Sequence, residues 1–356
     1  MSILTILFAI LMFSFLIFIH ELGHFIAAKS FGVQVNEFSL FMGPALWKKQ
    51  IGETLYAIRL VPIGGFCAME GEDGDSDSPR SFTNAAWWKR LIILVAGAAV
   101  NFIAGVILLG CFFLPQERFN LPVIAEVYPE CSFAGESGIQ VGDRVLEVDG
   151  EKIYTYSDFT LLTELRPSDT HDLVLLRDGE KVVLNDLLME KHEIVQEDGT
   201  SRLLYGFSFG STEATFPELV KYTWNNALDN VRLVRLSLQL LVTGQAGLKD
   251  VSGPVGIVQQ MSEVAQESGS LYYAFLNMIY FTGFIAINLA VMNLLPIPAL
   301  DGGRAVGVLL TTAVEKITRR KLDPKYEGYV HGAGMILLLA LMAVIMFKDI
   351  FVIVKG

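Results

Sequence analysis

The chain has 356 residues, of which 52% are hydrophobic and only 18% are charged. Soluble domains carry about 25% charged residues, so this composition excludes an ordinary soluble enzyme as well as a disordered chain. The net charge of −11 also argues against a nucleic-acid partner, which would require a basic face on the protein.

The shortage of charge comes from four long runs that contain no charged residue: 1–19, 91–116, 268–300 and 328–347. A helix of about 20 apolar residues crosses the hydrocarbon core of a lipid bilayer, which is about 30 Å thick. We therefore predict an integral membrane protein whose four transmembrane helices lie within 1–30, 90–115, 269–301 and 331–354.

The basic residues predict how these helices are oriented, because short cytoplasmic loops collect Lys and Arg. Two connections, between the first and second helices and between the third and fourth, contain such residues: Lys29, Lys48, Lys49, Arg59, Arg80, Lys89, Arg90, Arg304, Lys316, Arg319, Arg320, Lys321 and Lys325. Both connections are expected in the cytoplasm, so both termini and the acidic segment 115–270 lie outside it. The first run lacks the preceding basic residues of a signal peptide, and we expect it to be retained.

Segments outside the predicted membrane helices have other compositions. Between the first two helices, 31–89 is expected to be a cytoplasmic, β-rich loop with a strand at 54–61. The segment 120–210 predicts one small domain of short strands and two tight Asp-Gly turns. Its strands are expected at 123–127, 144–148, 173–177 and 181–184. Residues 216–268 follow as an extracytoplasmic helical region, because apolar side chains recur there at spacings of three and four.

The strongest motif is His20-Glu21-Leu22-Gly23-His24, at the end of the first hydrophobic helix. Residues four apart lie on the same face of a helix, so His20 and His24 can hold one Zn²⁺ ion. Glu21 can then reach a water on that metal as a general base. Ionisable side chains are costly inside a membrane and usually functional there, so we predict a catalytic zinc site.

A catalytic zinc site needs a third protein ligand, with the fourth position left open for water. Asp301 is the better candidate, because it closes the third uncharged run near the same cytoplasmic boundary as the two histidines. Pro296 and Pro298 cannot continue a helix, so the chain just before Asp301 is expected to be non-helical. His331, at the start of the fourth helix, is the weaker alternative.

These residues resemble the site-2 protease family of intramembrane zinc metalloproteases, in the bacterial branch represented by the regulator of sigma-E protease. Besides HExxH, the chain has the family pattern NxxPxPxLDG, which begins at Asn293 and includes Asp301. The segment 138–145 is similar to part of a PDZ domain, and 120–210 has room for one such domain where some members have two. Two shorter matches are Gly97-x-x-x-Asn101 and Ser252-Gly253-Pro254-Val255-Gly256.

The resemblance implies a fold class and a set of site residues. The fold would be an α-helical integral membrane protein with four transmembrane helices, a small extracytoplasmic PDZ-like β/α domain and a membrane-associated β-sheet on the cytoplasmic side. Within it, His20, His24 and Asp301 would bind Zn²⁺, Glu21 would be the general base, and Asn293 would bind the substrate.

The resemblance also implies partners and a compartment. The family cuts peptide bonds within or near transmembrane segments, so the expected partners are the lipid bilayer and single-span membrane proteins such as anti-sigma factors or remnant signal peptides. An edge strand such as 54–61 would pair with the extended substrate, and the PDZ groove would be a site for a peptide. The expected location is the bacterial cytoplasmic (inner) membrane, with the active site near its cytoplasmic face.

Two other functions stay open at the level of the sequence, a catalytically inactive membrane scaffold built on the PDZ domain and a zinc transporter. A scaffold has no need of a general base, yet Glu21 is present. A transporter would line its path with further intramembrane carboxylates, which the uncharged runs lack. A zinc-dependent metalloendopeptidase is therefore the favoured interpretation.

Overall fold

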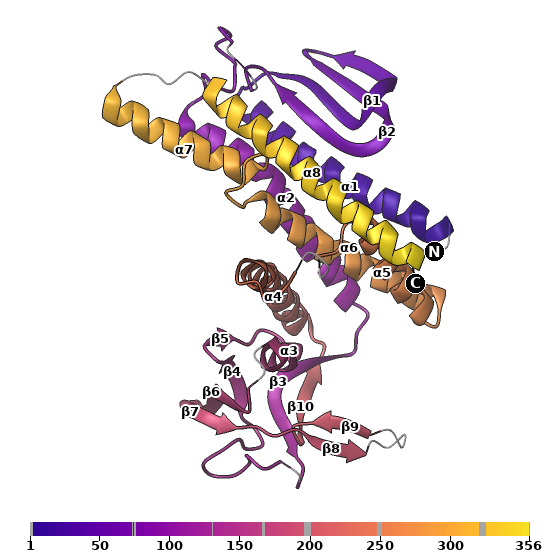
Figure 1. Ribbon diagram of the computed structural model, residues 1–356, viewed down its shortest axis with the longest axis vertical. Coiled ribbons are helices and arrows are strands. Elements are labelled where there is room, and N and C mark those ends of the chain that lie inside the picture. The colour runs from indigo at the N-terminus through magenta and orange to yellow at the C-terminus, as the bar shows by residue number, and fades with distance from the viewer. Residues whose placement is uncertain are drawn as a thin grey trace. The chain divides into compact units, whose positions relative to one another are not determined.

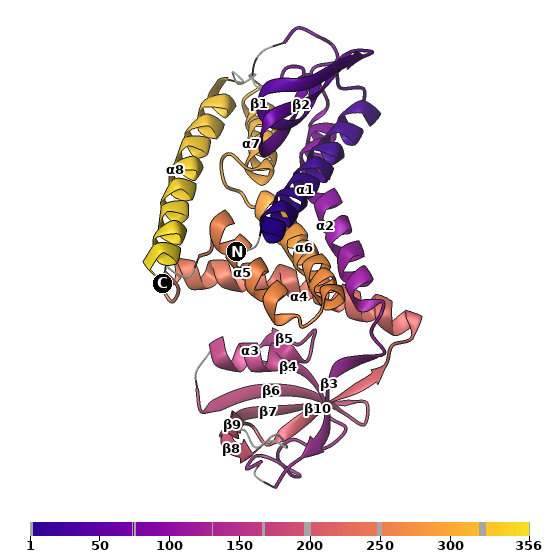
Figure 2. The ribbon, with the colours of Figure 1, turned by 90° about the vertical axis from the view of Figure 1, so that its right-hand side faces the viewer.

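The computed structural model describes residues 3–72, 74, 76–129, 131–165, 168–195, 201–247, 251–319 and 325–355. The chain forms two compact units. One consists of Met1–Phe112 together with Leu233–Gly356, and the other is Phe113–Arg232. The first unit is mainly helical, and the second contains most of the strands (Figures 1 and 2).

Four helices in the described residues are long and apolar enough to cross a membrane, which confirms the number predicted from the uncharged runs. They are α1 (Ile3–Ser30), α2 (Trp87–Phe113), α6 (Leu271–Asn293) and α8 (Lys325–Lys355). Inside a bilayer every backbone N–H and C=O group needs a partner within the protein, and a continuous helix provides these partners along its length.

Helices α1, α2 and α6 pack closely because small residues lie where they cross. A Cβ atom at Gly23 of α1 would lie 2.9 Å from the Cα atom of Gly97 in α2. A Cβ atom at Gly105 of α2 would lie 3.0 Å from the carbonyl oxygen of Gly283 in α6. Buried apolar side chains of α1, α6 and the neighbouring helix α5 (Pro254–Glu267) complete this core.

Helix α8 packs differently from the other three membrane-length helices. Only 6% of its apolar window is buried, against 28%, 33% and 39% in α1, α2 and α6. It contacts α5 and α7 (Asp301–Thr318), and most of its remaining apolar surface is exposed (Figure 2). Such a surface is typical of a helix whose neighbours are lipid chains, because lipid is as apolar as the side chains themselves.

Asp349 of α8 joins this helix to the N-terminus of α5. Its Oδ2 atom accepts hydrogen bonds from the backbone N–H groups of Gly253 (2.9 Å) and Gly256 (3.0 Å). The first N–H groups of a helix have no partner inside the helix, and a negative charge beside them is favourable. A Cβ atom at Gly253 would lie 2.8 Å from the same oxygen, which explains the glycine at this position of the Ser252-Gly253-Pro254-Val255-Gly256 motif.

We expect Asp349→Ala to lower the thermal unfolding midpoint of the detergent-solubilised protein, because two N–H groups lose their acceptor. The loss of a helix cap costs about 0.5–2 kcal/mol. Hydrogen exchange at the Gly253 and Gly256 amides should become faster, while exchange in α6 should not change. Unchanged exchange at both glycines would show that the carboxylate does not cap α5.

The segment between α1 and α2 forms an antiparallel hairpin of β1 (Val35–Ile51) and β2 (Thr54–Met69). Strand β2 bends at Gly64, whose φ of 73° favours glycine, and it therefore pairs with β1 twice. Phe38 of β1 lies between Tyr56 and Cys67 of β2. The first half of β2 pairs with β1 on both sides, because residues 55–58 lie between Glu37–Leu40 and Trp47–Gln50, so the expectation that 54–61 is an edge strand is wrong. Within the described residues, the second half of β2, Gly65–Met69, pairs on one side only and is an edge of this sheet.

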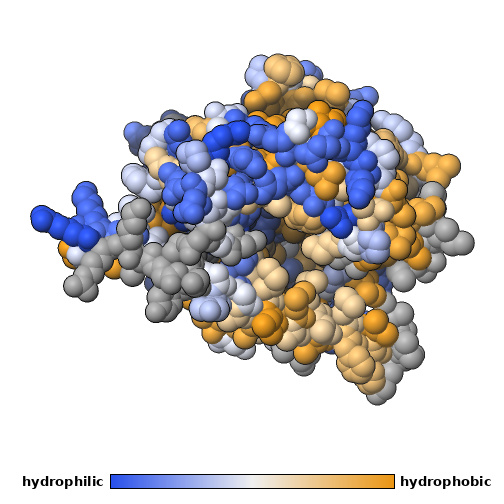
Figure 3. Space-filling view, turned by 90° about the horizontal axis from the view of Figure 1, so that it is seen from above, coloured by the Kyte–Doolittle hydropathy of each residue, from blue (hydrophilic) through white to orange (hydrophobic). Residues whose placement is uncertain are grey.

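The far part of this hairpin exposes large apolar side chains next to lysines: Met42, Leu46, Trp47, Ile51, Ile58, Leu60 and Val61, with Lys48 and Lys49. Figure 3 shows the molecule from the end where this sheet lies, with hydrophilic and hydrophobic residues adjoining on one face. Apolar and aromatic side chains beside lysines are typical of protein surfaces at the boundary between lipid and water.

The second unit, Phe113–Arg232, is built on an antiparallel sheet with the strand order β10-β3-β4-β6-β7, and β5 pairs with β4. Its strands include all four that the sequence predicts. The elements of this part of the chain are β3 (Arg118–Val127), β4 (Arg144–Val148), β5 (Glu151–Lys152), α3 (Ser157–Leu165), β6 (Thr170–Arg177), β7 (Glu180–Leu188), β8 (His192–Val195), β9 (Ser201–Leu204), β10 (Phe207–Glu213) and α4 (Phe216–Val242). Strands β8 and β9 form a separate hairpin, which the sequence does not predict.

The two Asp-Gly turns of this unit are confirmed. Asp149 and Asp178 have φ values of 49° and 51°, and the glycine after each also has a positive φ. These values match the tight hairpin turn in which both central residues adopt a left-handed conformation. The turns connect β4 to β5 and β6 to β7.

A buried ion cluster joins α3 to the first part of α4. The guanidinium of Arg232 contacts the carboxylates of Asp158 (2.6 Å) and Asp229, and it donates a hydrogen bond to the backbone carbonyl of Lys152. Asp158 also accepts hydrogen bonds from the backbone N–H and the hydroxyl of Thr155, both at 2.8 Å. Burial, together with the negative charge of Asp158, raises the pKa of Asp229 to about 7.

A raised pKa means that Asp229 binds its proton more tightly in the folded protein than in the unfolded chain. Its contribution to stability is therefore complete at low pH and is lost as the pH rises through about 7. Asp229→Asn imitates the protonated form, so the unfolding midpoint of the variant, relative to the natural protein, should rise from about pH 4 to about pH 7 and then level off.

Thermal unfolding of the whole detergent-solubilised chain at several pH values measures this difference. Glu164→Gln, at a carboxylate of α3 that is 60% exposed, is the matched control and should show no such trend. A difference between Asp229→Asn and the natural protein that stays constant over the range would contradict the raised pKa.

Candidate metal centre

The last turns of α1 bring two imidazoles together. His20 and His24 lie one turn apart, and their Nε2 atoms are 3.2 Å from each other. The two rings are nearly perpendicular, at 85°, so both nitrogens reach the same small space. Both side chains are largely buried, with exposed fractions of 14% and 8%.

Asp301 reaches the same place from a distant part of the sequence. Helix α6 ends at Asn293, and the proline-containing stretch after it is non-helical until α7 begins at Asp301 itself. This interruption of the helix agrees with the expectation from the two prolines. The Oδ2 atom of Asp301 lies 3.1 Å from Nε2 of His20 and 3.3 Å from Nε2 of His24.

The residues after Asp301 hold the start of α7 in place. A Cβ atom at Gly302 would overlap the backbone of Leu294, so this glycine lets α7 begin directly against the stretch that follows α6. Arg304, one turn into α7, forms an ion pair with Glu72 just after β2. Asp301 is therefore tied both to the end of α6 and to the β1–β2 segment.

The three side chains fit a divalent metal ion. Zinc binds nitrogen and oxygen ligands at about 2.0–2.2 Å, so two ligand atoms of a tetrahedral site are about 3.3–3.5 Å apart. The three separations here, 3.1, 3.2 and 3.3 Å, form a nearly equilateral triangle close to that size. The Oδ2 atom of Asp301 is buried and has no hydrogen-bond partner, which a metal ion would provide.

Glu21 lies beside this triangle of ligand atoms. It follows His20 directly in α1, and it interacts electrostatically with His20, His24 and Asp301. Its Cγ atom lies 3.5 Å from the position that a Cβ atom would take at Gly65 in β2. The carboxylate expected to act as a general base is thus close both to the ligand cluster and to an edge of the β1–β2 sheet.

Helix α2 passes the two imidazoles with a glycine. A Cβ atom at Gly97 would lie 2.8 Å from the Cε1 atoms of both His20 and His24. One turn before Gly97, the carbonyl oxygen of Ile93 lies 2.8 Å from Nδ1 of His24. One turn after Gly97, the amide of Asn101 lies 3.4 Å from Nδ1 of His20. From the sequence, Gly97 and Asn101 are only a motif match, and a backbone carbonyl leaves no sequence signal at all.

Two other predicted residues lie outside the ligand cluster. Asn293, the last residue of α6, is half-buried, and its side chain forms no hydrogen bond with any described residue. His331 lies in α8, and His171 and His192 belong to the second unit. In the described part of the chain, the one group of three metal-ligating side chains consists of His20, His24 and Asp301.

Helix α1, which is long enough to cross a membrane, carries two histidines and a glutamate, and Asp301 adds a carboxylate to them. This combination is typical of one class of proteins, the membrane-embedded metallopeptidases. Comparison with known proteins supports the assignment to this class. A family model described as Peptidase family M50 matches residues 8–341. A Clostridium perfringens protein named "Putative zinc metalloprotease" is 36% identical over 97% of this chain and 98% of its own length. The "Regulator of sigma-W protease RasP" of Bacillus subtilis is 27% identical over 97% of this chain and 98% of its own.

The chain belongs to peptidase family M50, the site-2 protease family, which confirms the resemblance carried by HExxH and NxxPxPxLDG. It is a metalloprotease of the site-2 type, and its function is that of an intramembrane zinc metalloprotease. The "Zinc metalloprotease RasP" of Oceanobacillus iheyensis, 28% identical over 97% of this chain and 98% of its own, is a further relative with this name. The scaffold and the transporter are not favoured.

Gly97→Ala tests the close approach of α2 to the imidazoles. The added methyl group must displace His20 and His24, so we expect the purified protein to hold metal about 10–100-fold more weakly. Competition with a chromogenic chelator measures this change. Gly332→Ala is the matched control, because a Cβ atom at Gly332 of α8 would contact nothing within 4 Å. Equal metal affinity in the two variants would contradict the steric role of Gly97.

Proposed function

We propose that this intramembrane protease holds Zn²⁺ through His20, His24 and Asp301 and that Glu21 is its general base. The observation that carries the proposal is the triangle of ligand atoms with sides of 3.1–3.3 Å, built from two separate segments of the chain. Two nitrogens and one oxygen leave the fourth tetrahedral position for a water or the substrate.

The metal ion, Glu21 and Asn293 have different roles in the proposed reaction. The bound ion supplies Lewis-acid activation of a water and of the scissile carbonyl. Glu21 takes a proton from that water and delivers it to the leaving amine, for which a carboxylate next to the site is suited. Asn293, whose amide has no partner among the described residues, donates a hydrogen bond to the substrate backbone or to the developing oxyanion.

The substrate class follows from the setting of the site. The peptide groups of a transmembrane helix are already hydrogen-bonded within the helix. The segment that contains the scissile bond must therefore unwind and become extended before it can be cut. The second half of β2, Gly65–Met69, has an unpaired edge among the described residues, and Gly65 in it lies close to Glu21. We infer that the substrate adds to this sheet as an extra strand, which keeps its backbone paired while it reaches the metal.

The proposed substrates are single-span membrane proteins. One relative is named a regulator of sigma-W protease, which favours anti-sigma factors that another protease has already shortened. Remnant signal peptides are the second candidate, because they too are short, membrane-spanning chains. The location that fits is the bacterial cytoplasmic membrane, with both termini outside and the metal near the cytoplasmic face.

The unit Phe113–Arg232 is proposed to be a single extracytoplasmic PDZ-like domain. Its six-stranded antiparallel sheet, with helix α3 after β5, supports this assignment. Phe159 of α3 is buried against the aromatic rings of Tyr205, Phe207 and Phe209. Because these rings fill the space between α3 and β10, the unit is better suited to excluding bulky substrates than to binding a large side chain there.

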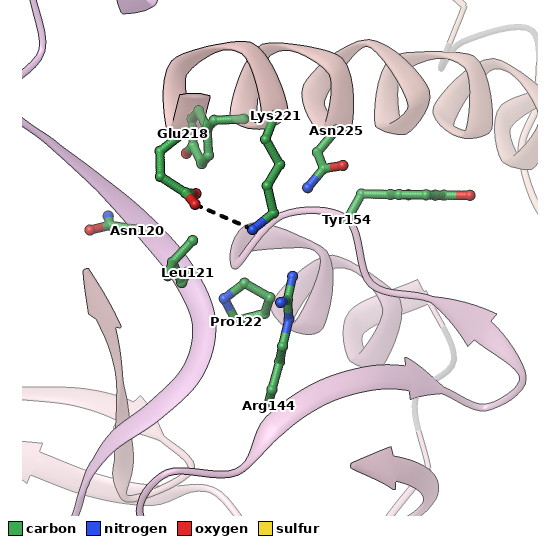
Figure 4. A pocket seen from close by; sticks show the side chains of 9 residues that line it. Asn120, Leu121, Pro122, Arg144, Tyr154, Glu218, Lys221 and Asn225 are labelled. Carbon is green, nitrogen blue, oxygen red and sulfur yellow. Dashed lines mark hydrogen bonds and ion pairs between the residues drawn. The ribbon is translucent and has the colours of Figure 1, made fainter. Parts of the chain in front are cut away.

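A small cavity elsewhere in this unit has room for about one water molecule. It lies between the start of α4 and strands β3 and β4, and Lys221 pairs with Glu218 along the α4 side of it at 3.5 Å (Figure 4). Its lining residues are Asn120, Leu121, Pro122, Arg144, Tyr154, Glu218, Lys221, Tyr222 and Asn225.

Glu21→Gln and Asp301→Ala separate the general base from a metal ligand. Glu21→Gln should keep zinc but lose cleavage of a model transmembrane substrate by a factor of about 10²–10⁴, because a general base contributes about that much. Asp301→Ala should lose both zinc and cleavage, since two imidazoles alone are an incomplete ligand set.

Zinc content and cleavage of the natural protein, the two variants and His331→Ala should be measured side by side. We expect His331→Ala to keep both. If it lost both while Asp301→Ala kept them, the assignment of the third ligand would be wrong. Full cleavage by Glu21→Gln would remove the general base from the proposal.

A further inference from the structure

The residues of α2 that face the two imidazoles form a stripe with a spacing of four: Ile93, Gly97 and Asn101. At Ile93 the contact has a fixed direction. A carbonyl oxygen can only accept, so Nδ1 of His24 carries the hydrogen and donates it over 2.8 Å. The other ring nitrogen, Nε2, then has a free lone pair directed toward Asp301.

Asn101 stands in the matching position beside His20. It is 1% exposed, and its amide lies 3.4 Å from Nδ1 of His20. With the nitrogen Nδ2 toward the ring, the amide oxygen Oδ1 is buried without any hydrogen-bond partner. A buried polar atom without a partner costs about 1–3 kcal/mol, and this cost falls on Oδ1 in this orientation and on Nδ2 in the opposite one.

The amide nitrogen and oxygen of asparagine are nearly indistinguishable in shape, and the hydrogen-bond network decides between the two orientations. If Nδ2 faced the ring, Nδ1 of His20 would have to accept, and the hydrogen of the neutral ring would lie on Nε2. That hydrogen would point into the space between His24 and Asp301, where the metal belongs. If Oδ1 faces the ring, it accepts from Nδ1–H, and Nε2 keeps the lone pair that a metal ligand needs, so the ligand cluster decides between the two orientations.

We propose that Asn101 is a positioning residue whose side-chain oxygen accepts a hydrogen bond from Nδ1–H of His20. Asn101 thereby holds the imidazole in the tautomer that leaves Nε2 free for the metal, as the backbone of Ile93 does for His24. Helix α2, which contributes no ligand, orients both histidine ligands of α1. This inference rests on the proposed zinc site formed by His20, His24 and Asp301.

Two substitutions with opposite chemistry test the direction of the hydrogen bond. Asn101→Leu keeps the approximate size of the side chain but removes the acceptor, and we expect zinc to bind about 10–100-fold more weakly. Asn101→Asp keeps an acceptor and removes the amide donor, and we expect it to bind zinc within a few-fold of the natural protein. Competition with a chromogenic chelator gives the affinities without any measurement of proteolysis.

Asn288→Leu is the matched control. Asn288 is also an amide in a membrane-length helix, but it is half-buried and donates to the carbonyl of Phe284 in its own helix. This variant should bind zinc as the natural protein does, and thermal unfolding without metal shows which variants fold. If Asn101→Leu does not fold, Asn101→Asp alone decides. Aspartate has no amide donor, so weak zinc binding by this variant would show that the natural asparagine donates to the ring.

Zinc affinity of Asn101→Leu equal to that of the natural protein would overturn the inference, as would an equal loss in Asn101→Asp and Asn101→Leu. Failure of the proposed zinc site would look different. In that case the natural protein would bind zinc no better than His20→Ala, whatever residue stood at position 101.

Discussion

The structure depends on one constraint, that ionisable side chains buried within a membrane-length bundle must find their partners inside the protein. His20, His24 and Asp301 meet this requirement together, because their ligand atoms lie within 3.3 Å of one another around a space that suits one metal ion. Neither α1 nor α7 could leave such groups unpaired in an apolar setting without a large free-energy cost. The convergence of the three side chains therefore determines where the stretch between α6 and α7 must run.

Close packing of helices follows from the same requirement. A metal-sized triangle of ligand atoms forms only if the backbones carrying the ligands come close together, and glycine allows this approach at Gly23, Gly97 and Gly302. Helix α8 contacts α5 and α7, and its Gly334 allows a close approach to Pro298 before Asp301, but most of its apolar surface stays exposed. The bundle thus combines a tightly packed part, which carries the proposed ligands, with one helix that is mostly exposed.

Much of this arrangement could be predicted from the sequence, because its signals are local. Uncharged runs give the membrane-length helices, the spacing of four gives the paired imidazoles, and two prolines give the interruption before Asp301. Other features depend on contacts between distant residues, which no local pattern records. The cap that Asp349 provides for α5, the helical start of α7 at Asp301 and the contact of Ile93 with His24 are of this kind. The β8–β9 hairpin was missed because its strands have four residues each.

The proposed ligands come from opposite ends of the chain, at positions 20 and 24 and at position 301. During synthesis on the ribosome, the imidazoles are made long before the aspartate. With this set of ligands, a nascent or truncated chain that stops before the third span would lack one of them. Such a protease would therefore be unable to act on its neighbours until its own translation is nearly complete.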